Sequence, residues 1–199
     1  MPAFKAIQVG MCAVLIAASV AAATEGTRYK GYEMPSYTVR STQGAIEVRD
    51  YAPHILAEVT VEGNRNRAIA RGFQVLANYI FGGNADGEKI AMTVPVAQAP
   101  SGGNWTVSFM MPAAFTLDDL PKAQSDAVRF VETEPERQLV IQFSGLRTDR
   151  RIADYTEQLV TYAANQGFEI MDAPRYYFYD DPMTPPWSRR NEIAVPISG

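Results

Sequence analysis

The chain has 199 residues, 47% of them hydrophobic and 20% charged, and its formal net charge is −4 at pH 7. This size and composition are typical of a globular protein, and the mild acidity gives no reason to expect nucleic-acid binding. The single cysteine is Cys12 and the single histidine is His54. An internal disulfide and a zinc site built from several Cys or His side chains are therefore excluded.

The N-terminal segment is typical of a secretory signal peptide. Lys5 is followed by an uncharged, Ala-rich run over residues 6–23 that ends in Ala21-Ala22-Ala23. Small residues at this spacing are what a signal peptidase requires, so we expect residues 1–23 to be removed. The expected mature chain, residues 24–199, is a single domain in the periplasm or secreted, without stable membrane insertion. The alternative is a retained anchor, because the run is close to the minimum length of a membrane span.

The first half of the mature chain predicts four strands and one helix after a polar lead-in over residues 24–44. Alternation of apolar and polar residues indicates the strands, and a period of 3.6 indicates the helix, which ends at a Gly-Gly-Asn turn. In chain order, the predicted strands and helix cover residues 45–51, 55–61, 64–81 (the helix), 89–96 and 105–111.

The second half repeats this order. Strands are predicted at 127–132 and 139–143, a helix at 149–166, extended segments at 168–171 and 175–179, and a last strand at 192–197. Four residue pairs recur 82 positions apart: Ala45/Ala127, Pro53/Pro135, Gly63/Gly145 and Trp105/Trp187. We therefore predict an α+β fold with a duplicated β-β-α-β-β unit, its halves at about 37–112 and 120–198. Each unit buries its open face against the other, which favours pseudo-symmetric antiparallel sheets in a distorted barrel, each covered by one long helix.

The first helix carries more apolar surface than one sheet requires. On a helical wheel its apolar side chains form two adjacent stripes: Ile69, Phe73, Leu76 and Ile80 on one, and Ala68, Gly72, Val75 and Tyr79 on the other. Gly72 costs about 1 kcal/mol relative to Ala in a helix, and close approach of another backbone or of a flat ligand would offset this. The second stripe is therefore a candidate ligand face, with extra core packing as the alternative.

Three segments resemble the SOUL haem-binding protein family over residues 32–198. They are Ile46-Glu47-Val48-Arg49-Asp50-Tyr51 with Ala57-Glu58-Val59, then Tyr79 to Asn84 with Lys89-Ile90-Ala91-Met92-Thr93-Val94-Pro95-Val96, and Tyr179-Asp180-Asp181-Pro182-Met183 with Arg189-Arg190-Asn191-Glu192-Ile193. The resemblance implies reversible, non-covalent binding of haem or free porphyrin against the first-repeat helix, with basic residues near the propionates. The implied role is that of a tetrapyrrole carrier or buffer and not of an enzyme. We expect the chain to be a monomer.

The residues that would hold the tetrapyrrole follow from the helical wheel and from this resemblance. Some members of the family carry a histidine, considered an iron ligand, where this chain has Asp50. His54 is the remaining candidate metal ligand, so we expect binding mainly through apolar contact and propionate pairing. The predicted ligand-binding residues are Arg67, Ala68, Arg71, Gly72, Val75, Tyr79 and Tyr179.

Two alternative functions stay open. The fold also resembles the drug-sensing domains of some regulators, which makes a binding module for other flat hydrophobic molecules the first alternative. The second is a tetrapyrrole-modifying enzyme that uses Glu47, Glu58 or Glu192 as an acid, although no paired-carboxylate or metal-ligand spacing supports it.

Overall fold

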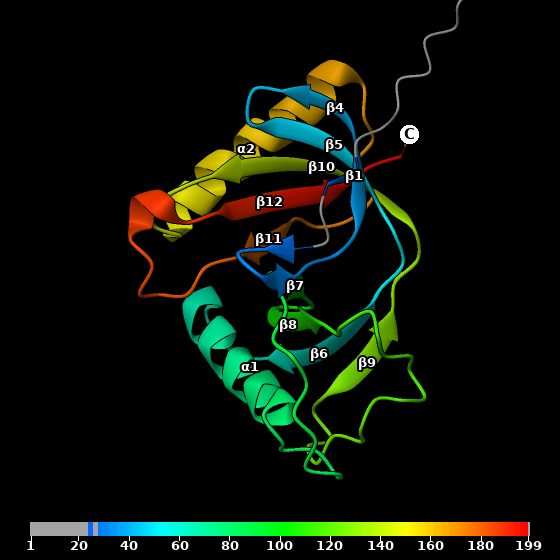
Figure 1. The fold of residues 1–199 in the computed structure, drawn as a ribbon. Coiled ribbons are helices and arrows are strands. Elements are labelled where there is room, and N and C mark those ends of the chain that lie inside the picture. The colour runs from blue at the N-terminus through cyan, green and yellow to red at the C-terminus, as the bar shows by residue number, and fades with distance from the viewer. Residues whose placement is uncertain (1–23, 26–27, 199) are drawn as a thin grey trace, which may run out of the picture.

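The computed structural model describes residues 24–25 and 28–198 (Figure 1). They form one large open antiparallel sheet with both helices on the same face, and a separate two-stranded hairpin. The expected signal peptide at residues 1–23 lies outside the described residues. Among the described helices, none has the length and apolar character needed to cross a membrane.

The element order is that of a duplicated β-β-α-β-β unit, as predicted. The first unit comprises β5 (Ile46–Tyr51), β6 (Ile55–Val61), α1 (Arg65–Ile80), β7 (Val96–Ser101) and β8 (Asn104–Met110). The second unit comprises β9 (Arg129–Glu132), β10 (Glu136–Phe143), α2 (Asp149–Gln166), β11 (Arg175–Phe178), the short 3₁₀ helix η1 (Pro186–Ser188) and β12 (Asn191–Pro196). Before them come β1 (Thr24–Glu25), β2 (Arg28–Tyr29), β3 (Tyr32–Glu33) and β4 (Tyr37–Gln43).

The sheet has the strand order β1-β4-β5-β10-β12-β11-β7-β8-β6-β9, so the two units are related by a pseudo-twofold axis between β11 and β7. The first strand of each unit is exchanged, because β5 pairs with β10 and β9 pairs with β6. One edge of the sheet is formed by β1 and β4 and the other edge by β9, and these two edges do not pair with each other. The distorted barrel predicted from the sequence is therefore wrong: one continuous sheet joins the units through the β11–β7 ladder, and it stays open.

A glycine with positive φ precedes each helix, Gly63 by two residues and Gly145 by four. Gly63 and Gly145 have φ values of 109° and 103°, which a residue with a Cβ rarely adopts. The N-cap residue, Asn64 directly after Gly63 and Thr148 three residues after Gly145, accepts a hydrogen bond from a backbone N–H of the first helical turn. The 82-residue repeat at Gly63/Gly145 thus marks the turn that follows the second strand of each unit, two residues after β6 and β10.

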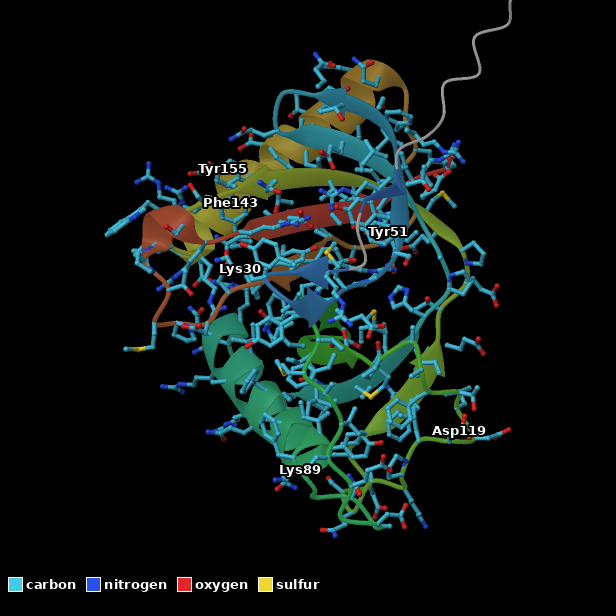
Figure 2. The ribbon with its side chains drawn as sticks, viewed as in Figure 1. Lys30, Tyr51, Lys89, Asp119, Phe143 and Tyr155 are labelled. Atoms are coloured by element: carbon cyan, nitrogen blue, oxygen red, sulfur yellow. The ribbon has the colours of Figure 1, made fainter. Side chains whose placement is uncertain are left out.

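Each helix covers its own apolar cluster. α1 packs on β6 and β8 over a cluster that includes Leu76, Val107 and Phe109, and α2 packs on β10 and β12. Figure 2 shows Phe143 of β10 beside Tyr155 of α2, and the two rings stack with centroids 4.2 Å apart. Because the helices leave the other face of the sheet free, any covering of that face must come from elsewhere in the chain.

Several predicted boundaries differ from the structure. The lead-in contains β1 to β4, and within 168–171 only Ile170 makes a strand-like bridge. The strand predicted at 89–96 lies instead at β7, where pairing with β8 and β11 overrides a poor strand composition. Pro100 is accommodated in β7 because β11 pairs with residues 96–98 only. Trp187 falls in η1 and has no strand equivalence with Trp105.

Candidate functional site

The residues predicted on α1 divide between the buried and the exposed sides of the helix. Ala68 is fully buried against the sheet. A Cβ added at Gly72 would lie 2.6 Å from Cβ of Val107, so close approach of α1 to β8 explains the glycine. Tyr79 is buried and its hydroxyl donates a hydrogen bond of 2.9 Å to the carbonyl of Pro121. Burial raises the pKa of Tyr79 to about 12, so this hydroxyl stays protonated as a donor.

A small cavity of about 300 Å³ opens beside the C-terminal half of α1. Val75, which is partly exposed, and Tyr79 line it together with residues after β8. Its lining is largely apolar, with amide side chains at the rim. The full lining is Gln74, Val75, Asn78, Tyr79, Gly83, Ala123, Ser125 and Val128.

The exposed side of α1 is basic. The helix contains three arginines and no Asp or Glu. Arg67 and Arg71 are exposed, and the positions 67, 71 and 75 follow one stripe with a rise of about 6 Å per step. Arg65 is different: it is 6% exposed and its guanidinium donates to Asp149 and to the carbonyl of Arg147. The helix therefore presents two exposed guanidinium groups on the stripe that leads to the cavity beside Val75.

A larger cavity of about 520 Å³ lies on the helix-free face of the sheet. Its floor comes from β6, β7, β8, β9 and β11, and its far wall includes Pro35 and Tyr51. We call this cavity the central groove. The two remaining predicted residues, His54 and Tyr179, line the central groove and not the α1 cavity. The sequence-predicted set is thus divided between two places on opposite faces of the sheet.

His54 is placed as a neutral imidazole at the rim of the central groove. Its Nδ1 lies 2.9 Å from the carbonyl oxygen of Ala52, which can only accept, so Nδ1 carries the proton. Burial lowers the pKa of His54 and keeps the ring neutral near pH 7. Within the described part of the chain no group of three or more His, Cys, Asp or Glu side chains could hold a metal. Because α1 lies on the other face, His54 cannot reach a ligand bound there.

Tyr179 belongs to a buried ion cluster that sequence reasoning did not find. Its hydroxyl donates a 2.8 Å hydrogen bond to Glu192, which is completely buried. Arg49 makes a bidentate pair with Glu192 at 3.0 Å for both bonds, and Arg190 contacts the same carboxylate at 2.7 Å. Burial alone would raise the pKa of Glu192, but Arg49 and Arg190 outweigh it and lower the pKa. Glu192 is therefore a structural anion, and the Arg-Arg-Asn-Glu-Ile segment holds the sheet together.

The N-terminal segment seals this ion cluster from solvent. Tyr29 and Lys30 both bind Asp180, and Figure 2 shows Lys30 over the helix-free face near β12 and β11. Met34 and Tyr37 are buried against this face of the sheet. β2 and β3 thus cover the half of the sheet built from β5, β10 and β12, and leave the central groove open beside them.

A polar network lines the wall of the central groove nearest β11. Arg175 binds Glu136 with both guanidinium branches, and Tyr177 donates to Gln138 at 3.1 Å. These residues come from β10 and β11 and are 39 positions apart in the sequence, so no local sequence motif predicts their contact. Both strands pair with β12, one on each side, and this brings the four residues together.

The family can be read from comparison with known proteins. The SOUL haem-binding protein model matches residues 32–196. The chain belongs to this SOUL family. It is 28% identical over 185 residues to heme-binding protein 2 of Homo sapiens, covering 86% of this chain and 87% of that protein. It is 29% identical over 152 residues to heme-binding protein 2 of Mus musculus, covering 70% and 72%.

Solved structures share the fold at low sequence identity. The EcmrR C-terminal domain superposes with a TM-score of 0.61 at 10% identity, covering 77% of this chain and 96% of that one. A hydrolase from Listeria innocua gives a TM-score of 0.55 at 12% identity, covering 80% and 94%. These likenesses confirm the α+β architecture. Membership of the SOUL family agrees with non-covalent haem or porphyrin as the ligand expected from the sequence.

Proposed function

We propose that this SOUL-family protein binds haem or free porphyrin reversibly along α1 and serves as a tetrapyrrole carrier or buffer. The observation that carries this proposal is the exposed side of α1, where Arg67 and Arg71 lie in line with the cavity beside Val75. A porphyrin is a flat apolar plate with two carboxylates on one edge, so it requires an apolar surface next to basic side chains. The periplasmic or secreted location expected from residues 1–23 is part of the same proposal.

The geometry favours binding with one edge of the plate inserted. The cavity of about 300 Å³ is smaller than the macrocycle, so the plate enters beside Val75 and leaves its other edge outside. Buried apolar area contributes roughly 25 cal/mol per Å² before the cost of association. The propionates then extend toward Arg71 and Arg67, which are about 6 and 12 Å along the helix axis from Val75. A partly exposed ligand of this kind is suited to delivery.

Iron ligation has no part in this mode of binding. His54 lies in the central groove, on the far side of the sheet from α1. Free protoporphyrin should therefore bind about as tightly as haemin.

The enzymatic alternative has less support. Two of its three candidate acids are already paired: Glu47 with Arg49 at 2.7 Å, and Glu192 with Arg49 and Arg190. The third, Glu58, lines the central groove away from α1. A non-enzymatic role predicts that the absorption spectrum of bound haem is stable under reductant and oxygen.

The test is a titration of the protein with haemin and with protoporphyrin, followed by Soret absorption and tryptophan fluorescence. We expect saturation at one equivalent, and a loss of affinity of about tenfold or more in the double variant Arg67→Glu/Arg71→Glu. Arg150→Glu, an exposed position on α2, is the matched charge-reversal control and should bind normally. Transfer of haem from the loaded protein to apomyoglobin would measure the carrier property directly.

Three results would contradict the proposal: uptake that never saturates, an equal loss in Arg150→Glu, or haem that cannot be passed to apomyoglobin. Loss of haemin binding in His54→Ala with retained protoporphyrin binding would move the site to the central groove.

A further inference from the structure

The central groove is a cavity, whereas the equivalent surface of the other repeat is filled by side chains. The strand ladders show which residues of the two halves correspond. Val140 pairs with Glu47 in one half, and Glu58 pairs with Arg129 in the other, so Glu58 is the counterpart of Val140. By the same ladders, Glu192 of the covered half corresponds to Thr106 of the groove. The covered half is filled by charged and aromatic side chains, whereas the groove floor carries small ones: Ala97, Ala99, Thr106 and Ser108. Small floor residues are what leave the volume of about 520 Å³.

Glu58 lies on the groove floor at a position where packing does not require a charged side chain. Its counterpart Val140 is fully buried and apolar, so the fold accepts a hydrophobic side chain at this position. Glu58 is partly buried and forms no ion pair with any residue in the described part of the chain. Burial raises the pKa of its carboxyl against the opposing influence of Arg129 and Arg175. A carboxylate held in a cavity without a partner is a candidate counter-ion for a ligand.

Most of the charged side chains that line the groove are acidic. Four acidic side chains line it, at positions 58, 134, 136 and 172, against the two arginines Arg129 and Arg175. Arg175 is already engaged by Glu136 at 3.1 Å and by Asp172 at 3.6 Å. The remaining charge is therefore negative, which disfavours the two propionates of a haem and favours a cation.

We propose that the central groove is a second ligand site, selective for a flat apolar organic cation, with Glu58 as its counter-ion. Leu56, Met110 and Val131 supply apolar wall around this carboxylate. Tyr177 adds an aromatic ring, which attracts cations at its face. The ring of Tyr179 is already covered by Arg190. A concave apolar surface with a single convergent charge is the usual composition of a small-molecule site. This site is independent of the proposed haem site on α1, from which the sheet separates it.

The experiment compares two fluorescent dyes that share the xanthene ring but differ in charge, cationic pyronin Y and anionic fluorescein. Anisotropy titrations of the full chain should give saturable one-to-one binding of pyronin Y and no saturable binding of fluorescein. Glu58→Gln, which keeps the shape and removes the charge, should weaken pyronin Y binding by about tenfold or more. Glu132→Gln removes the same charge from β9, at a position outside the groove lining, and should leave binding unchanged.

A second variant and a competition keep the outcome decisive. Ala99→Trp should fill the groove and abolish pyronin Y binding while circular dichroism stays native. Haemin should not displace pyronin Y, and Glu58→Gln should bind haemin normally, so failure of one site can be told from failure of the other. Equal binding of both dyes, unchanged affinity in Glu58→Gln, or displacement of pyronin Y by haemin would each overturn the proposal.

Discussion

The helix-free face of the sheet is treated in opposite ways by the two repeats. In the second repeat, the N-terminal segment covers it and the space is filled by Arg49, Glu192 and Arg190. In the first repeat, the corresponding surface carries Val131 and Thr106 and stays open as the central groove. One duplicated scaffold therefore supplies a sealed half that holds the molecule together and an open half that is free to bind. Duplication followed by one-sided covering is a simple route from a symmetric fold to an asymmetric function.

The sealed half should depend strongly on its central anion. Glu192→Ala would remove the carboxylate that Arg190 binds and leave the buried Arg49 with Glu47 alone, at an expected cost of about 3–5 kcal/mol in the free energy of unfolding. The pseudo-equivalent Thr106→Ala, in the open half, is the matched control and should cost less than about 1 kcal/mol. Urea denaturation followed by circular dichroism measures both. Similar losses in the two variants would remove the distinction between the halves.

The helix side of the open half should be sensitive to added volume. Gly72→Ala gains about 1 kcal/mol of helix propensity, yet its Cβ would lie 2.6 Å from Val107, so we expect a net loss of about 1–3 kcal/mol. The double variant Gly72→Ala/Val107→Ala should recover part of that loss by relieving the clash, although it removes apolar packing. Thermal unfolding of the single and double variants gives the coupling. Purely additive losses would mean that the close approach of α1 to β8 is not what requires the glycine.

The smallest expected effect is that of Glu58→Gln on the free energy of unfolding, and this effect should depend on pH. Because the folded protein raises the pKa of Glu58, its ionised carboxylate destabilises the fold at pH values above that raised pKa. Glu58→Gln should therefore be slightly more stable than the wild type at pH 7, by no more than about 1 kcal/mol. Below the ordinary Glu pKa the carboxyl is protonated in both states, so this advantage should vanish. A constant difference from pH 4 to pH 7 would contradict the assignment.

The sequence predicts the two helices and the first two strands of each repeat well, because their signals are local. Alternation identifies β5 and β6, and Gly63 and Gly145 mark the turns after β6 and β10. β7 was misplaced because its Ala-Gln-Ala-Pro-Ser composition has little strand character, and only pairing on both sides makes it a strand. The barrel was wrong because strand exchange and the β11–β7 ladder are choices between distant segments, which periodicity does not encode.

The candidate sites could be predicted only in part. Helical periodicity placed Arg67, Arg71 and Val75 on neighbouring positions of α1, but it could not tell that Gly72 faces Val107. The central groove depends on which half the N-terminal segment covers, and this information lies in contacts such as those of Tyr29 and Lys30 with Asp180. The lack of an ion-pair partner for Glu58 is visible only in three dimensions.

The exchange of first strands between the repeats has a consequence for how the protein must assemble. Because β5 completes the sheet of the second repeat and β9 that of the first, neither repeat alone can satisfy its own edge. A chain cut between β8 and β9 would give two fragments that each expose an unpaired strand and an unfilled partner edge. Such fragments should be insoluble apart and complementary when mixed, so the two halves form one cooperative unit in spite of their common design.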